Sequence, residues 1–229
     1  MLGIITAMDV ELELITAAMK IEEETTVSGL SFKKGTLGNT EVVAVIGGIG
    51  KVAAALTTQI LISVFGATEI VNTGISGSVS PELRQGDVII AKDFVQHDVD
   101  TSPLGDPVGL VSGINRIDFP CDESLRQKLL TAARAQGTAK VHEGRIATGD
   151  QFIASREKAQ WIADTFGAVS CEMEGGSIAH VCFMAGVPFA AVRCISDDAG
   201  DGMTYQELRT YTSHISSGII LSAFGAQGE

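Results

Sequence analysis

Two adjacent acids, Asp197 and Asp198, follow an apolar run at residues 189–192 that is typical of a buried strand. Arg193 and Ser196 lie between this run and the acids. Like-charged neighbours beside an apolar sheet raise the pKa of one carboxyl group, which then stays protonated near neutral pH and can donate a proton. The pattern therefore predicts a general acid at the end of this strand.

A second pair of acids, Glu172 and Glu174, stands where another strand-like run gives way to a helix of small residues. Carboxylates in this place can accept hydrogen bonds from sugar hydroxyls, but acids at a helix start also stabilise the helix dipole without binding anything. Glu11, in the first turn of the first predicted helix, is by itself an ordinary helix-start glutamate. Only its combination with the other acids makes it a candidate base.

Two glycine-rich segments, residues 47–51 and 72–78, are predicted to be turns after buried strands. Ligands of open α/β sheets bind beyond the carboxyl ends of the strands, and glycine lets them approach the backbone. The first segment is not a P-loop, because Val45 and Val52 stand where glycine and Ser or Thr are needed. A dinucleotide-binding turn at 48–53 and a tight turn without a ligand are the alternatives.

The composition excludes several classes of partner and site. A formal net charge of −12 disfavours nucleic acid and anionic membrane, so a small neutral or cationic substrate fits better. His97 and Asp98 have no further ligands at metal-binding spacing, and the four cysteines are scattered. No serine-nucleophile motif is present. We therefore expect neither a metal, nor a cofactor, nor a covalent mechanism.

The start of the chain does not resemble a signal peptide, and no apolar run is long enough to cross a membrane. These features predict a cytoplasmic protein. Hydrophobic residues make up 45% and charged residues 19% of the sequence, which suits a well-filled core. The absence of repeats and low-complexity linkers predicts one domain spanning residues 1–229.

Strand-like runs alternate with helical periods, which predicts a three-layer α/β sandwich with a mixed, largely parallel central sheet. Apolar residues recur with helical spacing near 52–64, 125–129 and 162–166, and a last helix is predicted at 204–223. Residues 97–121 hold three of the five prolines and no clear period, as in a lid or an interface loop, although a plain surface loop is the alternative. The predicted strands are 2–6, 42–46, 69–73, 88–95, 141–148, 168–172 and 189–196.

In their order and spacing these motifs resemble the 5′-methylthioadenosine/S-adenosylhomocysteine nucleosidases of the purine nucleoside phosphorylase-like superfamily. Each motif is moderately specific, whereas the ordered set is highly specific and covers nearly the whole chain. The motifs are Gly3-Ile4-Ile5-x-Ala7-Met8-x-x-Glu11, Gly48-Ile49-Gly50-Lys51-Val52-Ala53-Ala54-Ala55, Asn72-Thr73-Gly74, His97-Asp98, Gly149-Asp150-x-Phe152-Ile153, Glu172-Met173-Glu174 and Arg193-x-Ile195-Ser196-Asp197.

The resemblance implies a nucleoside phosphorylase-like fold and a homodimer in which the partner's 97–121 loop closes the pocket. It implies that Asp197, held by Ser196, protonates N7 of a purine, while Glu11 activates water. Further implied substrate contacts are Met173 and Glu174 with the ribose, Phe152 and Ile153 with adenine, Met8 and Ile49 with the ribose and 5′-thio group, and Ser76, Gly77, Glu172, Arg193 and Tyr205 elsewhere in the pocket.

The expected reaction is hydrolysis of 5′-methylthioadenosine and S-adenosylhomocysteine. Adenine leaves readily only when protonated, and an acid at the nucleophile site repels phosphate and so favours water. Departures from the family pattern lie on the 5′ side, where Leu104 replaces an aromatic residue, Ser112 a proline, and Tyr205 a phenylalanine, while Gln151 replaces a small residue beside the adenine position. Hydrolysis of aminodeoxyfutalosine, a phosphate-dependent phosphorylase and a non-catalytic nucleoside-binding protein are the alternatives.

Overall fold

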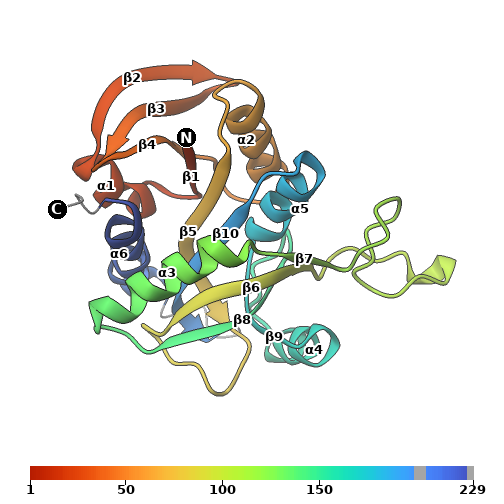
Figure 1. Cartoon of the computed structure of the whole chain (residues 1–229). Helices are drawn as coiled ribbons and strands as arrows, with labels where there is room; N and C mark the ends of the chain where they lie inside the picture. The colour runs from red at the N-terminus through yellow and green to blue at the C-terminus, as the bar shows by residue number, and fades with distance from the viewer. Residues whose placement is uncertain (199–204, 226–229) are drawn as a thin grey trace.

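The structure, a computed structural model, describes the backbone at residues 1–198 and 205–225 and the side chains at residues 1–196 and 208–225. Within these residues ten strands form one sheet (Figure 1). The strands are β1 (Leu2–Thr6), β2 (Lys20–Val27), β3 (Leu30–Leu37), β4 (Thr40–Ile46), β5 (Glu69–Ser78), β6 (Val88–Gln96), β7 (Asp118–Pro120), β8 (Val141–Thr148), β9 (Ala168–Glu172) and β10 (Phe189–Asp198).

Parallel pairing joins β4, β1, β5 and β10 in one group and β6, β8 and β9 in another. Antiparallel pairing joins β10 to β6 and β5 to β9, so that β5, β10, β6, β8 and β9 form a closed ring of strands. The outer strands β2, β3 and β7 are added antiparallel. The predicted mixed sheet, with parallel pairing in its interior, is confirmed.

Helices cover both faces of the sheet (Figure 1). On one face α6 packs against α1 and α3 and contacts β5 and β10. On the other, α2 and α5 pack on each other, and α4 contacts β9. This confirms the three-layer arrangement. The helices are α1 (Asp9–Ala18), α2 (Lys51–Ser63), α3 (Glu123–Gln136), α4 (Arg156–Phe166), α5 (Gly175–Ala185) and α6 (Tyr205–Phe224).

The local sequence explains most of these boundaries. The continuously apolar residues 42–45 and 88–91 are fully buried, as expected for strands covered on both faces. Helices α3 and α4 end at Gly137 and Gly167, whose φ angles of 63° and 66° lie in the left-handed region that glycine adopts without strain. Their first turns are capped by the side chains of Asp122 and Ser155.

The strands differ from the sequence prediction in two places: one hairpin was missed, and one predicted turn is a strand. The hairpin of β2 and β3 was not predicted, because Lys20–Val27 is mostly exposed and rich in glutamate, which is uncommon in strands. The glycine-rich residues 72–78 are not a turn, since β5 continues through them to Ser78. They stay extended because β10 pairs with β5 along its length and β9 pairs with its end.

The segment between β6 and β7 projects from the body of the molecule at the right of Figure 1. It holds a short 3₁₀ helix, Ser102–Leu104, whose Leu104 is 84% exposed. Among the described residues, no helix has the length and apolar character needed to cross a membrane.

Candidate active site

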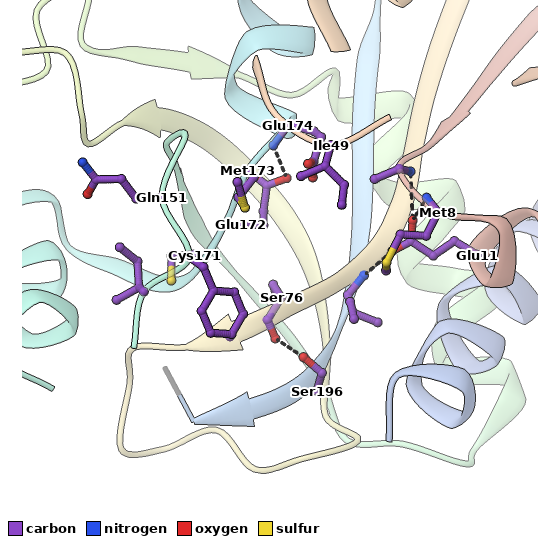
Figure 2. A pocket seen from close by; sticks show the side chains of 15 residues that line it. Met8, Glu11, Ile49, Ser76, Gln151, Cys171, Glu172, Met173, Glu174 and Ser196 are labelled. Carbon is purple, nitrogen blue, oxygen red and sulfur yellow. Dashed lines mark hydrogen bonds between the residues drawn. The ribbon is translucent and has the colours of Figure 1, made fainter. Parts of the chain in front are cut away.

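A cavity of about 310 Å³ opens at the carboxyl ends of the parallel strands, where the sequence predicted a site (Figure 2). Four residues that the prediction did not name as contacts also line it, namely Ala7, Ile75, Gln151 and Cys171, each next to a predicted one. The predicted residues that line it are Met8, Glu11, Ile49, Ser76, Gly77, Phe152, Ile153, Glu172, Met173, Glu174 and Ser196.

Unlike an ordinary glutamate in the first turn of a helix, Glu11 is buried, with only 2% of its surface exposed. Its Oε2 accepts hydrogen bonds from the backbone N–H groups of Ala7 at 2.8 Å and Met8 at 3.0 Å. Its Oε1 accepts a hydrogen bond from the N–H of Ile75 at 3.2 Å. Burial raises the pKa of this carboxyl group, and the nearby Arg193 together with the three N–H donors offsets only part of the rise. Glu11 is thus fixed in orientation and protonates more readily than a free glutamate.

Gly74 makes room for this carboxylate on β5. A Cβ atom at residue 74 would lie 2.5 Å from Oε1 of Glu11 and 3.2 Å from Nη1 of Arg193. Any larger residue would therefore displace the acid, which gives a physical reason for glycine in the Asn-Thr-Gly motif.

Beside Glu11 lies a buried ion pair between Glu172 and Arg193. Nη2 of Arg193 lies 2.5 Å from Oε2 of Glu172 and 2.5 Å from Oδ1 of Asn72. The same carboxylate oxygen accepts the N–H groups of Glu174 and Gly175, and Oε1 accepts the hydroxyl of Thr148. All of these partners belong to the protein. Arg193 is not among the described residues that line the cavity, and its guanidinium group contacts Glu172, which does line it.

Glu174, two residues further on, is in a different situation. Its Oε1 accepts the N–H of Gly50 at 2.9 Å, while Oε2 has no hydrogen-bond partner among the described residues. Burial and the neighbouring charge of Glu172 raise the pKa of Glu174 to about 8. One oxygen of this carboxyl group is therefore available to a ligand in the cavity.

Ser196 and Asp197 occupy a β-bulge. The pairing of β10 with β5 goes from Ile195 opposite Ser76 to Asp197 opposite Gly77, which leaves Ser196 as the extra residue. A bulge changes which face of the sheet the following side chain points to. The Ser196 hydroxyl donates to the carbonyl oxygen of Ser76 at 3.4 Å. The side chains of Asp197 and Tyr205 lie outside the described residues.

The opposite side of the cavity is formed by the segment after β8. Phe152 is 53% exposed, whereas Ile153 is buried, and Gln151 lines the opening. On β5, the buried Ser76 hydroxyl oxygen has no hydrogen-bond partner among the described residues. The cavity thus offers an aromatic ring and apolar side chains next to a few hydrogen-bonding groups, a lining typical of small-molecule sites.

Two features bear on the chemistry of the site: the charges of the cavity lining and the lack of a metal-binding cluster among the described residues. Among the described residues that line the cavity, none is Lys, Arg or His, while three are glutamates. The described part of the chain also contains no group of three or more His, Cys, Asp or Glu side chains that could hold a metal ion. Carboxylates in a partly dry cavity favour a species that carries positive charge.

Comparisons with known proteins agree with this geometry. The family profile described as "Phosphorylase superfamily" matches residues 1–216. A 5′-methylthioadenosine/S-adenosylhomocysteine nucleosidase of Geobacillus kaustophilus is 35% identical over 96% of this chain and 94% of its own. An aminodeoxyfutalosine nucleosidase of Helicobacter pylori is also 35% identical, over 96% of each chain. The crystal structure of the Neisseria meningitidis 5′-methylthioadenosine/S-adenosylhomocysteine nucleosidase with methylthio-immucillin-A superposes with a TM-score of 0.93, at 31% identity over 98% of both chains.

Proposed function

The chain belongs to the 5′-methylthioadenosine/S-adenosylhomocysteine nucleosidases of the phosphorylase superfamily, and we propose that it hydrolyses the N-glycosidic bond of these two nucleosides. The products are adenine and the corresponding 5′-thioribose. One observation carries the choice of water over phosphate as the nucleophile. The described cavity lining contains three glutamates and no cationic side chain, and phosphate sites rely on cationic side chains.

In the proposed mechanism Asp197 protonates N7 of the purine as the C–N bond breaks. Adenine is a poor leaving group as an anion, so this proton must arrive during cleavage. Glu11 accepts a proton from the attacking water, as the base does in a two-carboxylate glycosidase. The orientation of Glu11 by three backbone N–H groups supports this role, since it leaves little freedom to misplace the base.

The remaining contacts follow the two halves of a nucleoside. Glu174 accepts hydrogen bonds from the ribose hydroxyls through its free Oε2, with Met173 and Met8 against the sugar. Phe152 stacks on adenine, the backbone of Ile153 reads its edge, and Ile49 and Tyr205 lie near the 5′ substituent. Ser76 supplies a hydroxyl beside Gly77 on the sugar side. No step of this mechanism requires a metal or a cofactor.

A second substrate, aminodeoxyfutalosine, is favoured by one comparison. The Helicobacter pylori relative named for that nucleoside is as similar to this chain as the relative named for methylthioadenosine. The two substrates share the adenosine half and differ at the 5′ position, so the same acid and base would serve both.

The test is to incubate the purified protein with methylthioadenosine, S-adenosylhomocysteine, aminodeoxyfutalosine and adenosine separately, with and without phosphate, and to follow free adenine. We expect release from both thio-nucleosides that does not depend on phosphate. Release only with phosphate, together with ribose-1-phosphate as product, would identify a phosphorylase. Cleavage of aminodeoxyfutalosine alone would leave the acid–base assignment standing and contradict the assigned substrates.

We also propose a homodimer in which the partner's 97–121 segment lies near the cavity. On α2, Val52 and Leu56 lie one helical turn apart and are 80% and 46% exposed, and Val64, just after the helix, is 59% exposed. Exposed apolar side chains of this kind, together with a projecting segment that carries an exposed Leu104, are typical of an interface. Light scattering should give twice the chain mass, and Leu56→Glu should halve it. A monomeric wild type would contradict the dimer.

We propose further that residues 1–229 act as one domain in the cytoplasm. All four cysteines are free and buried in the structure, which suits a reducing compartment. Burial raises the pKa of Cys182 and Cys194 to about 12, so these thiols stay protonated.

A further inference from the structure

Three segments that are far apart in the sequence meet at the first turn of α2. The N–H of Lys51 donates to Oδ1 of Asp150 at 2.7 Å, and the N–H of Asp150 donates to Oδ2 of Asp98 at 2.9 Å. The ammonium group of Lys51 closes the ring by donating to Oδ1 of Asp98 at 2.6 Å. Lys51, Asp98 and Asp150 each belong to one of the sequence motifs, and the proposed mechanism gives none of these three residues a role.

The position of Lys51 is unfavourable for the helix itself. A cation in the first turn opposes the helix dipole, which favours acids there. The two acids of the ring compensate for this cation, and they come from other segments of the chain. The side chains of Lys51 and Asp98 are only 18% and 15% exposed, so this pair is more shielded from solvent than a surface ion pair. Although burial raises the pKa of Asp98, its hydrogen bonds from Lys51 and Asp150 outweigh burial and hold the pKa below its usual value.

Two sides of the cavity are attached to this ring. Gly50, which precedes Lys51, donates its N–H to the ribose-side carboxylate of Glu174. Asp150 directly precedes the segment 151–153 that lines the adenine side. Figure 2 shows Ile49 next to Glu174, with Gln151 on another part of the cavity wall. The ring therefore connects the two sides that hold the two halves of the nucleoside.

Gly50 shows how tightly the ring is packed. Its φ of 94° lies in the left-handed region, and a Cβ atom there would lie 2.9 Å from Oδ1 of Asp150. A glycine is needed both for this backbone conformation and for the approach of the Asp150 carboxylate to the helix start. The hydrogen bond of Gly50 to Glu174 thus depends on where Asp150 lies.

We propose that Lys51, Asp98 and Asp150 are positioning residues that set the distance between the adenine side and the ribose side of the cavity. This inference rests on the proposed function, because it concerns how the same nucleoside is held. None of the three residues touches the reacting atoms in this scheme. Their effect comes through Gly50 and the 151–153 segment, and displacements of about 1 Å in such contacts can cost on the order of 100-fold in rate.

The test uses Lys51→Met and Asp98→Asn, alone and together, with methylthioadenosine as substrate. The control is Lys33→Met, which breaks the Lys33–Glu24 pair of 2.8 Å on the exposed β2–β3 hairpin. We expect Lys51→Met to raise KM roughly 10-fold, to change kcat less, and to weaken the binding of free adenine measured by calorimetry. The double variant should be no worse than the poorer single variant, because both break one ring. Lys51→Arg should recover most of the loss.

Two outcomes would overturn the inference. One is a KM for Lys51→Met that equals that of Lys33→Met. The other is a double variant whose effect is the product of the two single effects, which would mean that the residues act separately. Both outcomes presuppose a wild type that releases adenine. A wild type that releases none would contradict the proposed function instead, and the affinity for adenine would still report on the ring.

Discussion

Three buried glutamates line the same cavity, and they fall into two groups that differ in their hydrogen-bond and charge partners. The first group, here called the floor, is Glu172, which lines the cavity, together with Arg193, Asn72 and Thr148, which do not line it but hydrogen-bond to Glu172 or to one another. The cavity wall consists of Glu11 and Glu174, whose carboxyl groups have raised pKa values and line the open space. The floor resembles a structural ion pair, and the wall resembles a site that is completed by a ligand. We therefore expect identical side chains to serve folding in one place and chemistry in the other.

The largest effect is expected from breaking the floor. Arg193→Met leaves the buried carboxylate of Glu172 without its cation, which costs about 3–5 kcal/mol of the free energy of unfolding. Urea denaturation measures this cost. The matched control is Arg145→Met, because Arg145 also pairs with an acid, Asp93 at 2.5 Å, but is one-third exposed. We expect about 1 kcal/mol or less for the control. Equal losses for the two variants would show that the buried pair of the floor stabilises the fold no more than a partly exposed ion pair.

Glu11→Gln should separate chemistry from folding at the wall. We expect kcat to fall roughly 1,000-fold, because a general base typically contributes 100- to 10,000-fold. The free energy of unfolding should stay within about 1 kcal/mol of wild type, since the amide oxygen can still accept backbone hydrogen bonds. Glu13→Gln, on the exposed side of the same helix, serves as the control and should leave kcat unchanged. A fully active Glu11→Gln would exclude Glu11 as the base.

The pair Glu172→Gln and Glu174→Gln sharpens the comparison, because only one residue, Met173, separates the exchanged sites. Glu174→Gln should lower kcat/KM about 30-fold, because an amide nitrogen replaces one of the two oxygens that can accept from the ribose hydroxyls. Glu172→Gln should instead lower the free energy of unfolding by about 2 kcal/mol, because it removes the charge opposite Arg193. Steady-state kinetics and urea denaturation on both proteins would show the division. If both variants lost stability and activity in the same proportion, floor and wall would be one unit.

Per pH unit, the smallest effect is the pH dependence of stability. A folded-state pKa of about 8 for Glu174 lies above its unfolded value, so between these values the folded state holds a proton that the unfolded state has lost. The stability of the ligand-free protein should therefore fall as pH rises from about 5 to 8, with a contribution of at most about 1.4 kcal/mol per pH unit from this group. Glu174→Gln should flatten the curve. A wild type whose thermal midpoint is constant over this range would contradict the raised pKa.

Sequence patterns alone located the interior strands well and the acids only partly. Runs such as 42–45 and 88–91 are apolar without a break, and only a strand covered on both faces accommodates them. The β2–β3 hairpin carries no such signal, because the residues of β2 are mostly exposed to solvent and need not be apolar. The sheet edge was therefore missed where its sequence is polar.

Glu11 shows why the site could not be derived from local sequence. Its place in the first turn of α1 has an ordinary explanation, and its burial depends on Gly74, Ile75 and Arg193, which lie more than sixty residues away. Only the resemblance to a known family pointed to this residue. The ring of Lys51, Asp98 and Asp150 was visible only as separate motifs, because nothing in one sequence indicates which motifs touch.

The pairing of β5 has a consequence for how the molecule opens. This strand pairs with β10 along nearly its whole length, with β1 over its first four residues and with β9 at its end. Its backbone amides should therefore exchange with deuterium only when the whole protein unfolds, whereas those of the 97–121 segment should exchange through local opening. Residues 74–77, on which one side of the cavity is built, belong to the slowest class. Local opening of the projecting segment can then occur without loosening the strand that carries Gly74 and Ser76.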